Sequence, residues 1–405
     1  MLWPIGIALG ISLGILAGLF PGMHPNTIAL FAPIFYSLLG GDYIAFLAFL
    51  VSLGVADAIV NFIPACLIGA PEESSSLSVL PGHRLLIEGK GEEAIQLAIL
   101  GCLGAIWFSL LLLPILYFVF PVLYSSMRSV VHILLLVVVA YLISKEKRKV
   151  MALLAFFLAG ILGIALDRLP LDPRFSLFPV FTGLFGLPVL LLALKEKSTF
   201  PEQKESRLVL SSVTFTRASL AGTLGGILVG LLPGIGPAQA IVVSGAILGS
   251  NEFRNERSFL ISQGAVALSN FLFSILAIVL IGNPRSGIAV VIDRYMRLDL
   301  FHLAYICFLS FLVTGIVGLI SLRLTRFFIK LMKRISYRLL NASIASILIG
   351  MVLYFTGFLG LFVLLVATLL GIYANLAQIS RSHLMGVLIL PTILFFAGVD
   401  PWSFL

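Results

Sequence analysis

The chain has 405 residues, of which 60% are hydrophobic and only 11% are charged. Its mean hydropathy is +1.14, and a water-soluble domain carries about 25% charged residues. These values exclude an ordinary soluble domain and predict an all-α polytopic membrane protein, because helices satisfy their own backbone hydrogen bonds in lipid. The net charge of +8 does not indicate nucleic-acid binding, since basic residues cluster at 145–149 and 323–338, as is typical of cytoplasmic loops.

A spanning helix needs about 20 apolar residues. We predict about 12 such helices, at residues 2–20, 43–68, 95–120, 129–143, 150–166, 175–194, 216–232, 258–281, 300–322, 338–356, 359–374 and 384–399. Two shorter apolar runs, residues 26–39 and 238–249, are too short to cross upright and are predicted half-helices or re-entrant segments. The polar stretch 195–207 predicts a cytoplasmic linker between a first transmembrane repeat, residues 1–194, and a second, residues 208–405.

The first segment has no basic region before it and no evident cleavage site, so it is interpreted as a retained span. The three cysteines lie in separate apolar runs and have no metal-ligand spacing. We expect a multi-pass protein of the cytoplasmic membrane.

Two octets, GLFPGMHP at residues 18–25 and GLLPGIGP at residues 230–237, interrupt apolar segments. A helix that breaks inside a bilayer leaves backbone groups that must face protein, water or a ligand. Paired interruptions at matching positions in two halves indicate the binding site of a secondary transporter.

The halves align beyond these octets. Asp57 and Asn270 follow at nearly equal spacing, and residues 69–71 then match residues 282–284 without a gap. The two basic clusters follow different numbers of spans, so placing both in the cytoplasm predicts opposite orientations for the halves. Inverted repeats of this kind bring two broken segments together near the bilayer midplane, with positive helix N-termini facing an anion.

The predicted substrate-binding residues come from the breaks and from the Gly–x–Pro segments after the following helices. They are Pro21, Gly22, His24, Asn26, Thr27, Gly69, Pro71, Ser74, Pro233, Gly234, Gly236, Gln239, Asn270, Asn283 and Arg285. Glycine permits close approach of a ligand to the backbone, and the amide and hydroxyl side chains donate to anions. The alternatives are a plain capped turn at each break, a satisfied buried histidine at His24, and solvated loops after Gly69 and Gly282.

Asp57 and Asn61 are the predicted ion-coupling residues. A carboxylate at the centre of a membrane helix costs about 2.5–3.5 kcal/mol on insertion scales and is a functional candidate. Asp57 could bind Na⁺ or carry H⁺, whereas its repeat partner Asn270 cannot titrate. The alternative is a hydrogen bond within the helix bundle.

Taken with residues 68–97, the duplicated octets resemble the TctA family, the large permease subunit of tripartite tricarboxylate transporters. The stretch 80–84 fills the family's Asp-Gly-Tyr-Pro place, and Gly89, Gly91 and Ala94 fill later positions. Residues 263–270 depart from the family pattern, since its acidic residues are missing and only Asn270 is kept. The resemblance implies a secondary transporter for an organic anion, with a small membrane subunit and an extracytoplasmic binding protein as possible partners.

We therefore expect a cation-coupled permease for a small organic anion, with a carboxylate as the substrate class and no cofactor other than Na⁺ or H⁺. The alternative is a translocase for a lipid-linked phosphate such as polyprenyl phosphate, because phosphate suits the same dipole-lined cleft. An intramembrane enzyme is disfavoured, since no second aspartate, histidine cluster or Ser–His pair accompanies Asp57. His83 and His383 are expected in loops and without a role.

Overall fold

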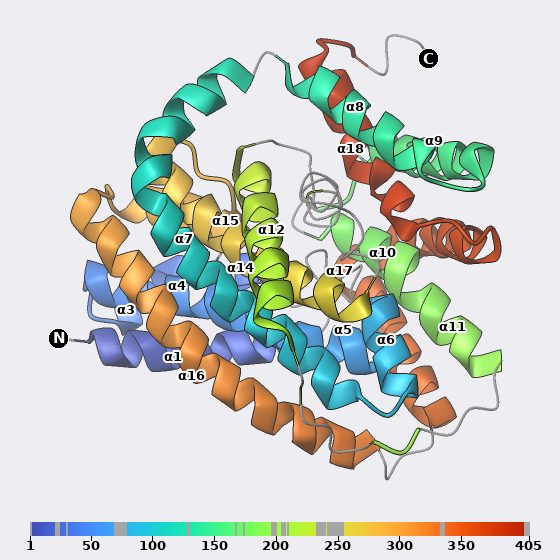
Figure 1. The fold of residues 1–405 in the computed structure, drawn as a ribbon, viewed down its shortest axis with the longest axis horizontal. Helices are drawn as coiled ribbons and strands as arrows, with labels where there is room; N and C mark the ends of the chain where they lie inside the picture. Colours follow the sequence, from blue (N-terminus) through green and yellow to red (C-terminus); the bar gives the residue numbers. More distant parts are fainter. Residues whose placement is uncertain are drawn as a thin grey trace.

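The computed structural model describes residues 2–20, 25–29, 31–68, 79–127, 130–166, 168–172, 175–195, 201–203, 208, 210–231, 240, 255–332 and 337–400. Every regular element among these residues is a helix (Figure 1). The helices are α1 (Trp3–Leu19), α2 (Pro25–Ala29), α3 (Ala32–Leu38), α4 (Tyr43–Val60), α5 (Phe62–Ile68), α6 (Val79–Ile87), α7 (Gly91–Met127), α8 (Val131–Ser144), α9 (Lys149–Leu166), α10 (Leu177–Phe181), the π-helix η2 (Thr182–Gly186), α11 (Leu187–Lys195), α12 (Ser212–Leu231), α14 (Glu256–Ile281), α15 (Gly287–Tyr295), α16 (Leu300–Met332), α17 (Tyr337–Leu376), the 3-10 helix η4 (Arg381–Met385) and α18 (Gly386–Phe396).

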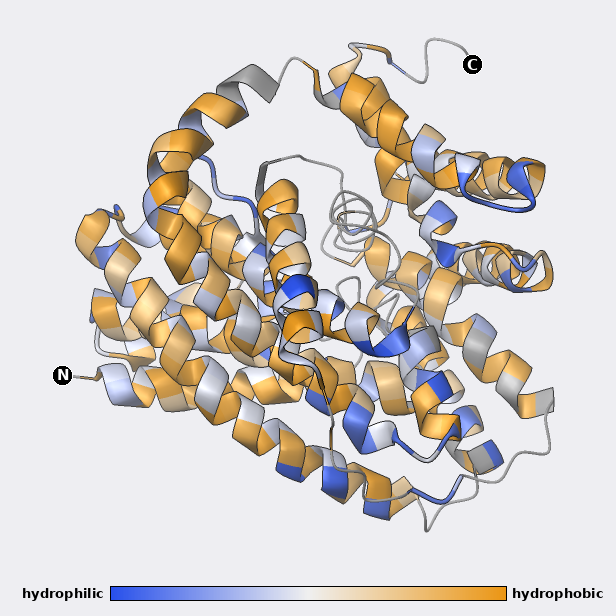
Figure 2. Cartoon of the chain, viewed as in Figure 1, coloured by the Kyte–Doolittle hydropathy of each residue, from blue (hydrophilic) through white to orange (hydrophobic). Residues whose placement is uncertain are grey.

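Within the described ranges, seven helices are long and apolar enough to cross a membrane, and four more are shorter and apolar. Apolar residues dominate all of them, whereas polar residues gather at helix ends and in loops (Figure 2). The predicted all-α membrane protein is therefore confirmed, whereas the described helices give seven long candidate spans and four shorter ones in place of the 12 or so spans predicted. The run 26–39 forms two short helices, α2 and α3, instead of a single half-helix. Of the run 238–249 only residue 240 is described.

A row of glycines allows α1 to pack closely against α4. The row contains four glycines at every fourth position, from Gly6 to Gly18. A Cβ atom at Gly6 would overlap the backbone of Ala45, and one at Gly18 would lie 2.9 Å from the Cβ of Val60. Small residues at this spacing let membrane helices approach closely. The contacts advance in the same direction along both helices, so α1 and α4 are parallel.

The helix pair α12 and α14 repeats this packing. Glycines at positions 10, 14 and 18 of α1 recur at 222, 226 and 230 of α12. A Cβ atom at Gly222 would overlap the carbonyl of Ser262, and one at Gly230 would lie 3.2 Å from the Cβ of Phe273. Therefore α12 and α14 are also parallel.

The parallel direction of α1 and α4 has a consequence for residues 20–42, which connect them. This segment must return over the whole length of α1, which is about 25 Å for 17 residues at 1.5 Å per residue. It contains the first interrupted octet and the short helices α2 and α3. The described part of this connection is helical only in α2 and α3, so no single long helix makes the return.

Side-chain contacts fix the directions of α7, α14 and α16. The ion pair of Arg257 with Glu93, at 2.6 Å, joins the first turns of α14 and α7. Phe120 and Phe273 stack further along, so these two helices are parallel. Arg326, near the end of α16, pairs with Glu92 at 2.8 Å, so α16 is antiparallel to α7.

Contacts at its two ends give the direction of α4. Near the start of α4, the ring of Phe46 lies 4.9 Å from the ring of Tyr295. Tyr295 is the last residue of α15 and comes shortly before the start of α16. At its other end α5 continues the chain, and Cys66 packs against Gly82 of α6, which leads into α7. Thus α4 runs from the side where α16 begins to the side where α7 begins. It is therefore antiparallel to α14.

A second group contains α8, α9, α10, η2, α11, α17 and α18, at the right of Figure 1. Gly357, with a φ of 65° and a ψ of −163°, divides α17 into two helical segments. Phe355 stacks on Phe175 before this point, whereas Gly371 packs against Leu184 and Pro188 after it. Residues from both segments share one cluster with α11. The chain therefore turns back at Gly357, which agrees with the prediction of two spans there.

Candidate functional site

Ten of the predicted binding residues lie outside the described ranges. They are Pro21, Gly22, His24, Gly69, Pro71, Ser74, Pro233, Gly234, Gly236 and Gln239. Thr27 lies on α2, and its side chain is not described. The predicted residues whose side chains the structure describes are Asn26, Asp57, Asn61, Asn270, Asn283 and Arg285.

Asn26, in the first turn of α2, reaches the second half of the chain. Its Oδ1 atom accepts a hydrogen bond of 3.0 Å from the backbone N–H of Ile288, in the first turn of α15. Gly287 makes this possible, because a Cβ atom there would lie 2.7 Å from the amide carbon of Asn26. The first four N–H groups of a helix lack partners within the helix. Asn26 supplies one of those partners from 262 residues away.

The segment from α14 to α15 is built around serine hydroxyls. Gly282 ends α14 with a φ of 63°, in the left-handed region favoured by glycine. Ser286 caps α15 by accepting from the N–H of Ala289 at 3.1 Å. The hydroxyls of Ser274 and Ser286 are 3.0 Å apart, which ties this turn to α14. The Gly–x–Pro segment after α14 therefore forms an ordered link between two helices.

Asn283 and Arg285 share a partner that the sequence interpretation did not identify. Asn283 donates from Nδ2 to the hydroxyl of Tyr124 at 3.0 Å. The guanidinium carbon of Arg285 lies 5.0 Å from the centre of the same ring, in the range of a cation–π contact. Tyr124 comes from the last turns of α7, in the first half of the chain. Segments from both halves therefore meet here, as they do at Asn26.

Asp57 and Asn61 lie at the end of α4 and are buried, with 6% and 1% exposure. The backbone N–H of Asn61 donates to the Asp57 carbonyl at 3.1 Å. Gly18 packs against this turn, since a Cβ atom there would lie 3.0 Å from the Asn61 nitrogen. The absence of a side chain at Gly18 is thus what lets the end of α1 pack against the Asp57 turn.

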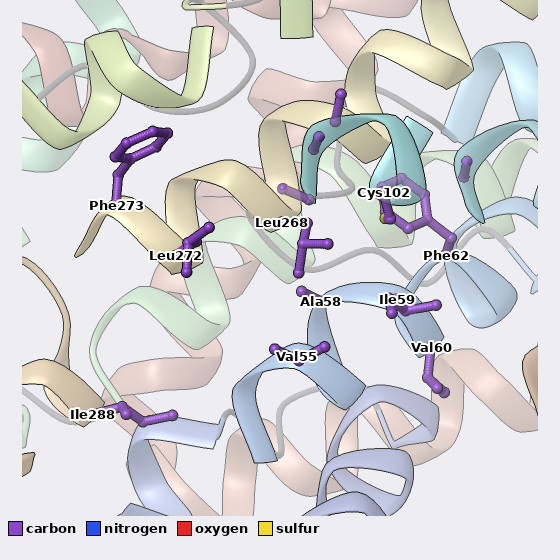
Figure 3. Packing of buried hydrophobic residues seen from close by; sticks show 14 of the residues in the cluster. Val55, Ala58, Ile59, Val60, Phe62, Cys102, Leu268, Leu272, Phe273 and Ile288 are labelled. Carbon is purple, nitrogen blue, oxygen red and sulfur yellow. The ribbon is translucent and has the colours of Figure 1, made fainter. Parts of the chain in front are cut away.

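Asn270, which the sequence alignment of the two halves pairs with Asp57, is half-buried on α14. A Cβ atom at Gly226 would lie 2.8 Å from its backbone nitrogen. Helices α4 and α14 cross where the ring of Phe271 fills the space over Gly54. Apolar side chains such as Val55 and Leu268 close the rest of this crossing (Figure 3). Both polar positions therefore lie within one turn of the crossing between the two halves.

A separate set of charged residues lies at the end of the bundle where α7 and α14 begin. Glu93 is 2% exposed and pairs with Arg257, and the more exposed Arg84 pairs with Glu256 at 3.0 Å. Gln203, in the polar stretch between α11 and α12, accepts from the N–H of Gly91 at 2.8 Å. The linker and the end of α16 therefore lie on one side of the bundle. No group of three or more potential metal ligands occurs among the described residues.

These helices, with polar groups from both halves meeting inside an apolar bundle, define a polytopic α-helical membrane protein. The chain belongs to the tripartite tricarboxylate transporter TctA family, whose model matches residues 5–386. The resemblance seen in the sequence is thus confirmed, and the chain falls in a family of membrane transporters and not of enzymes. The chain is also 31% identical over 387 residues to the uncharacterized protein MJ1079 of Methanocaldococcus jannaschii, covering 92% of this chain and 93% of that protein. No solved structure matches it.

Proposed function

We propose that this protein is a secondary active transporter that moves a small organic anion, a carboxylate, across the cytoplasmic membrane by cation-coupled alternating access. Membership of a transporter family supports the general activity. The observation that carries the mechanism is the opposite direction of α4 and α14, each packed on a glycine-lined helix in the same way.

This packing supports an inverted duplication with a first repeat at 1–194, a linker at 195–207 and a second repeat at 208–405. The glycines of α1 and α12 recur in the register that aligns the two interrupted octets. Each glycine row meets the next long helix of its own half, and those two helices run in opposite directions. Inverted repeats of this kind place a substrate site where the interrupted segments of both halves converge.

Each interrupted segment would supply unpaired backbone N–H groups to the bound anion. In the first half these groups would come from Pro21, Gly22 and His24, with Asn26 and Thr27 following on α2. The corresponding groups of the second half would be Pro233, Gly234, Gly236 and Gln239. Asn26 connects this region to α15, so movement of one half would be transmitted to the other through that hydrogen bond.

The driving cation would bind at Asp57. Burial of this carboxylate in an apolar helix has a cost that a coupling role explains. Asn61 lies one turn away and would contribute an amide oxygen or a carbonyl to a Na⁺ site. Asn61 packs against Gly18 at the end of α1. Binding of a cation at Asp57 and Asn61 would therefore shift the interrupted segment that follows α1.

Both basic clusters would face the cytoplasm in this arrangement. Because α17 turns back at Gly357, its start, which follows residues 323–336, and its end lie on one side. Arg148 of the 145–149 loop donates to the carbonyl of Ala377 at that end. A small membrane subunit and an extracytoplasmic binding protein are the partners that the family's description implies.

The alternative is a translocase for a lipid-linked phosphate such as polyprenyl phosphate. Uptake of radiolabelled di- and tricarboxylates into proteoliposomes, driven by a Na⁺ or H⁺ gradient, separates the two. Gradient-dependent accumulation of a carboxylate supports the permease. Movement of lipid-linked phosphate alone, without carboxylate uptake, contradicts it.

A further inference from the structure

The second helix group contains a buried cation that the proposed transport site does not use. Arg381, the first residue of η4, is 5% exposed. It donates from Nη2 to Oδ1 of Asn375 at 2.8 Å and from Nη1 to the carbonyl of Phe185 at 3.4 Å. Both acceptors are neutral, and no carboxylate of the described residues forms an ion pair with Arg381.

The Nε–H of Arg381 is buried and has no acceptor in the described part of the chain. A guanidinium has five N–H donors and cannot be deprotonated in a protein, so the charge stays. Burying an unpaired charge costs several kcal/mol, and removing that cost requires a counter-charge. A bound anion beside the Arg381 guanidinium would supply this counter-charge.

The position of Arg381 in the fold is also unusual. It lies where two irregular helical turns meet, the π-helix η2 and the 3-10 helix η4. Each turn leads directly into the last helix of its half, α11 or α18. Phe185, which accepts from Arg381, is part of the π-helix, and such turns are frequent at functional sites. This junction thus joins one irregular turn from each half, as the interrupted octets would in the first group.

The lysines of the nearby 145–149 loop would attract an anion toward Arg381. Lys145, Lys147 and Lys149 of that loop are exposed. The one acidic residue among them, Glu146, already accepts from the N–H of Ser380 at 2.8 Å and lies 3.1 Å from Nε2 of His383. His383 is buried in η4, not in a loop as the sequence suggested. Glu146 is therefore engaged beside Arg381 and leaves the guanidinium unneutralised.

We propose that Arg381 binds an oxyanion, a carboxylate or phosphate group, at the junction of η2 and η4, in a second site apart from the interrupted octets. The fork of Nε–H and the free N–H groups suits bidentate binding of such a group. The oxyanion comes either from a soluble solute or from the headgroup of an anionic lipid. This proposal does not depend on the identity of the transported solute. It can therefore hold even if the proposed permease function is wrong.

The test uses the full chain in a neutral detergent, labelled with ¹⁵N-arginine, so that the Nε–H signal of Arg381 reports on the site itself. The signal is assigned by its loss in Arg381→Lys. Titrants are inorganic phosphate, citrate and short-chain phosphatidylglycerol, with phosphatidylcholine of equal chain length as the neutral control. We expect a saturable shift of this signal with at least one anionic titrant and none with phosphatidylcholine.

Thermal unfolding supplies a second measurement. The same titrant should raise the melting temperature of the wild type, because a ligand that binds only the folded state stabilises it. Arg381→Gln should weaken this response at least tenfold, whereas Arg148→Gln, which removes an exposed charge nearby, should keep it. A response to phosphate or citrate identifies a soluble anion, and a response to phosphatidylglycerol alone identifies a lipid. An unmoved Nε–H signal with all three anions overturns the proposal.

Discussion

The glycine rows of α1 and α12 predict a pair of matched defects. In Gly14→Ala, the new Cβ atom would overlap the carbonyl oxygen of Leu53 and lie 2.6 Å from the Cβ of Ala56. In Gly226→Ala, it would overlap the hydroxyl of Ser269 and lie 2.7 Å from that residue's Cβ. Ordinary carbon contacts are about 3.5–4.0 Å, so each helix pair must separate.

Overpacking of this kind typically costs about 1–3 kcal/mol. We expect both variants to lower the melting temperature in detergent, since each new Cβ atom would lie well inside contact distance of the partner helix. Gly315→Ala is the matched control, because nothing lies within 4 Å of its new Cβ atom. Alanine at that helical position should leave stability unchanged or raise it by up to about 1 kcal/mol. The reasoning fails if Gly14→Ala and Gly226→Ala unfold at the wild-type temperature, or if Gly315→Ala is destabilised equally.

Three further changes test other contacts. Asp57→Asn should abolish or uncouple anion uptake into proteoliposomes while leaving the melting temperature near that of the wild type, because it removes the charge and keeps the shape. Asn26→Ala should lower stability by about 1 kcal/mol and speed hydrogen exchange at Ile288, because α15 loses a cap. Glu93→Gln should destabilise by about 1–3 kcal/mol, because the buried carboxylate loses its charge-assisted hydrogen bond to the half-exposed Arg257.

Two of these changes have a matched control variant. Asn26→Asp keeps an acceptor at the helix N-terminus and should restore protection of α15, so equal exchange in both Asn26 variants would contradict the cap. Glu256→Gln breaks the more exposed pair with Arg84 and should cost less than about 1 kcal/mol. Wild-type uptake by Asp57→Asn would remove Asp57 from the mechanism.

The helices of this fold were predictable because a bilayer sets their length and composition. Hydropathy alone located the segment 43–68, which the structure builds as α4 and α5. The break at Gly357 was also visible, since the predicted spans end at 356 and begin again at 359. The sequence shows the regular spacing of the glycines at 10, 14 and 18 and at 222, 226 and 230. It does not show which helix each row packs against.

Contacts between distant residues were not predictable. Asn26 was expected to face a ligand, and the structure joins it to α15 of the other half. Nothing local to Tyr124 indicated that Asn283 and Arg285 would meet on its ring. Arg381 has the sequence surroundings of an ordinary loop cation, and its burial depends on packing between η2 and η4. In each case the information lies in tertiary packing and not in periodicity.

The central claim is that the two interrupted octets converge on one anion. Met23→Cys and Ile235→Cys, introduced together after replacement of Cys66, Cys102 and Cys307, test it by cross-linking with a short bifunctional thiol reagent in proteoliposomes. The account predicts a cross-link that the transported carboxylate suppresses. It is contradicted if this pair does not react while a control pair placed at Trp107 and Phe311, whose rings lie 6.1 Å apart on α7 and α16, cross-links under the same conditions.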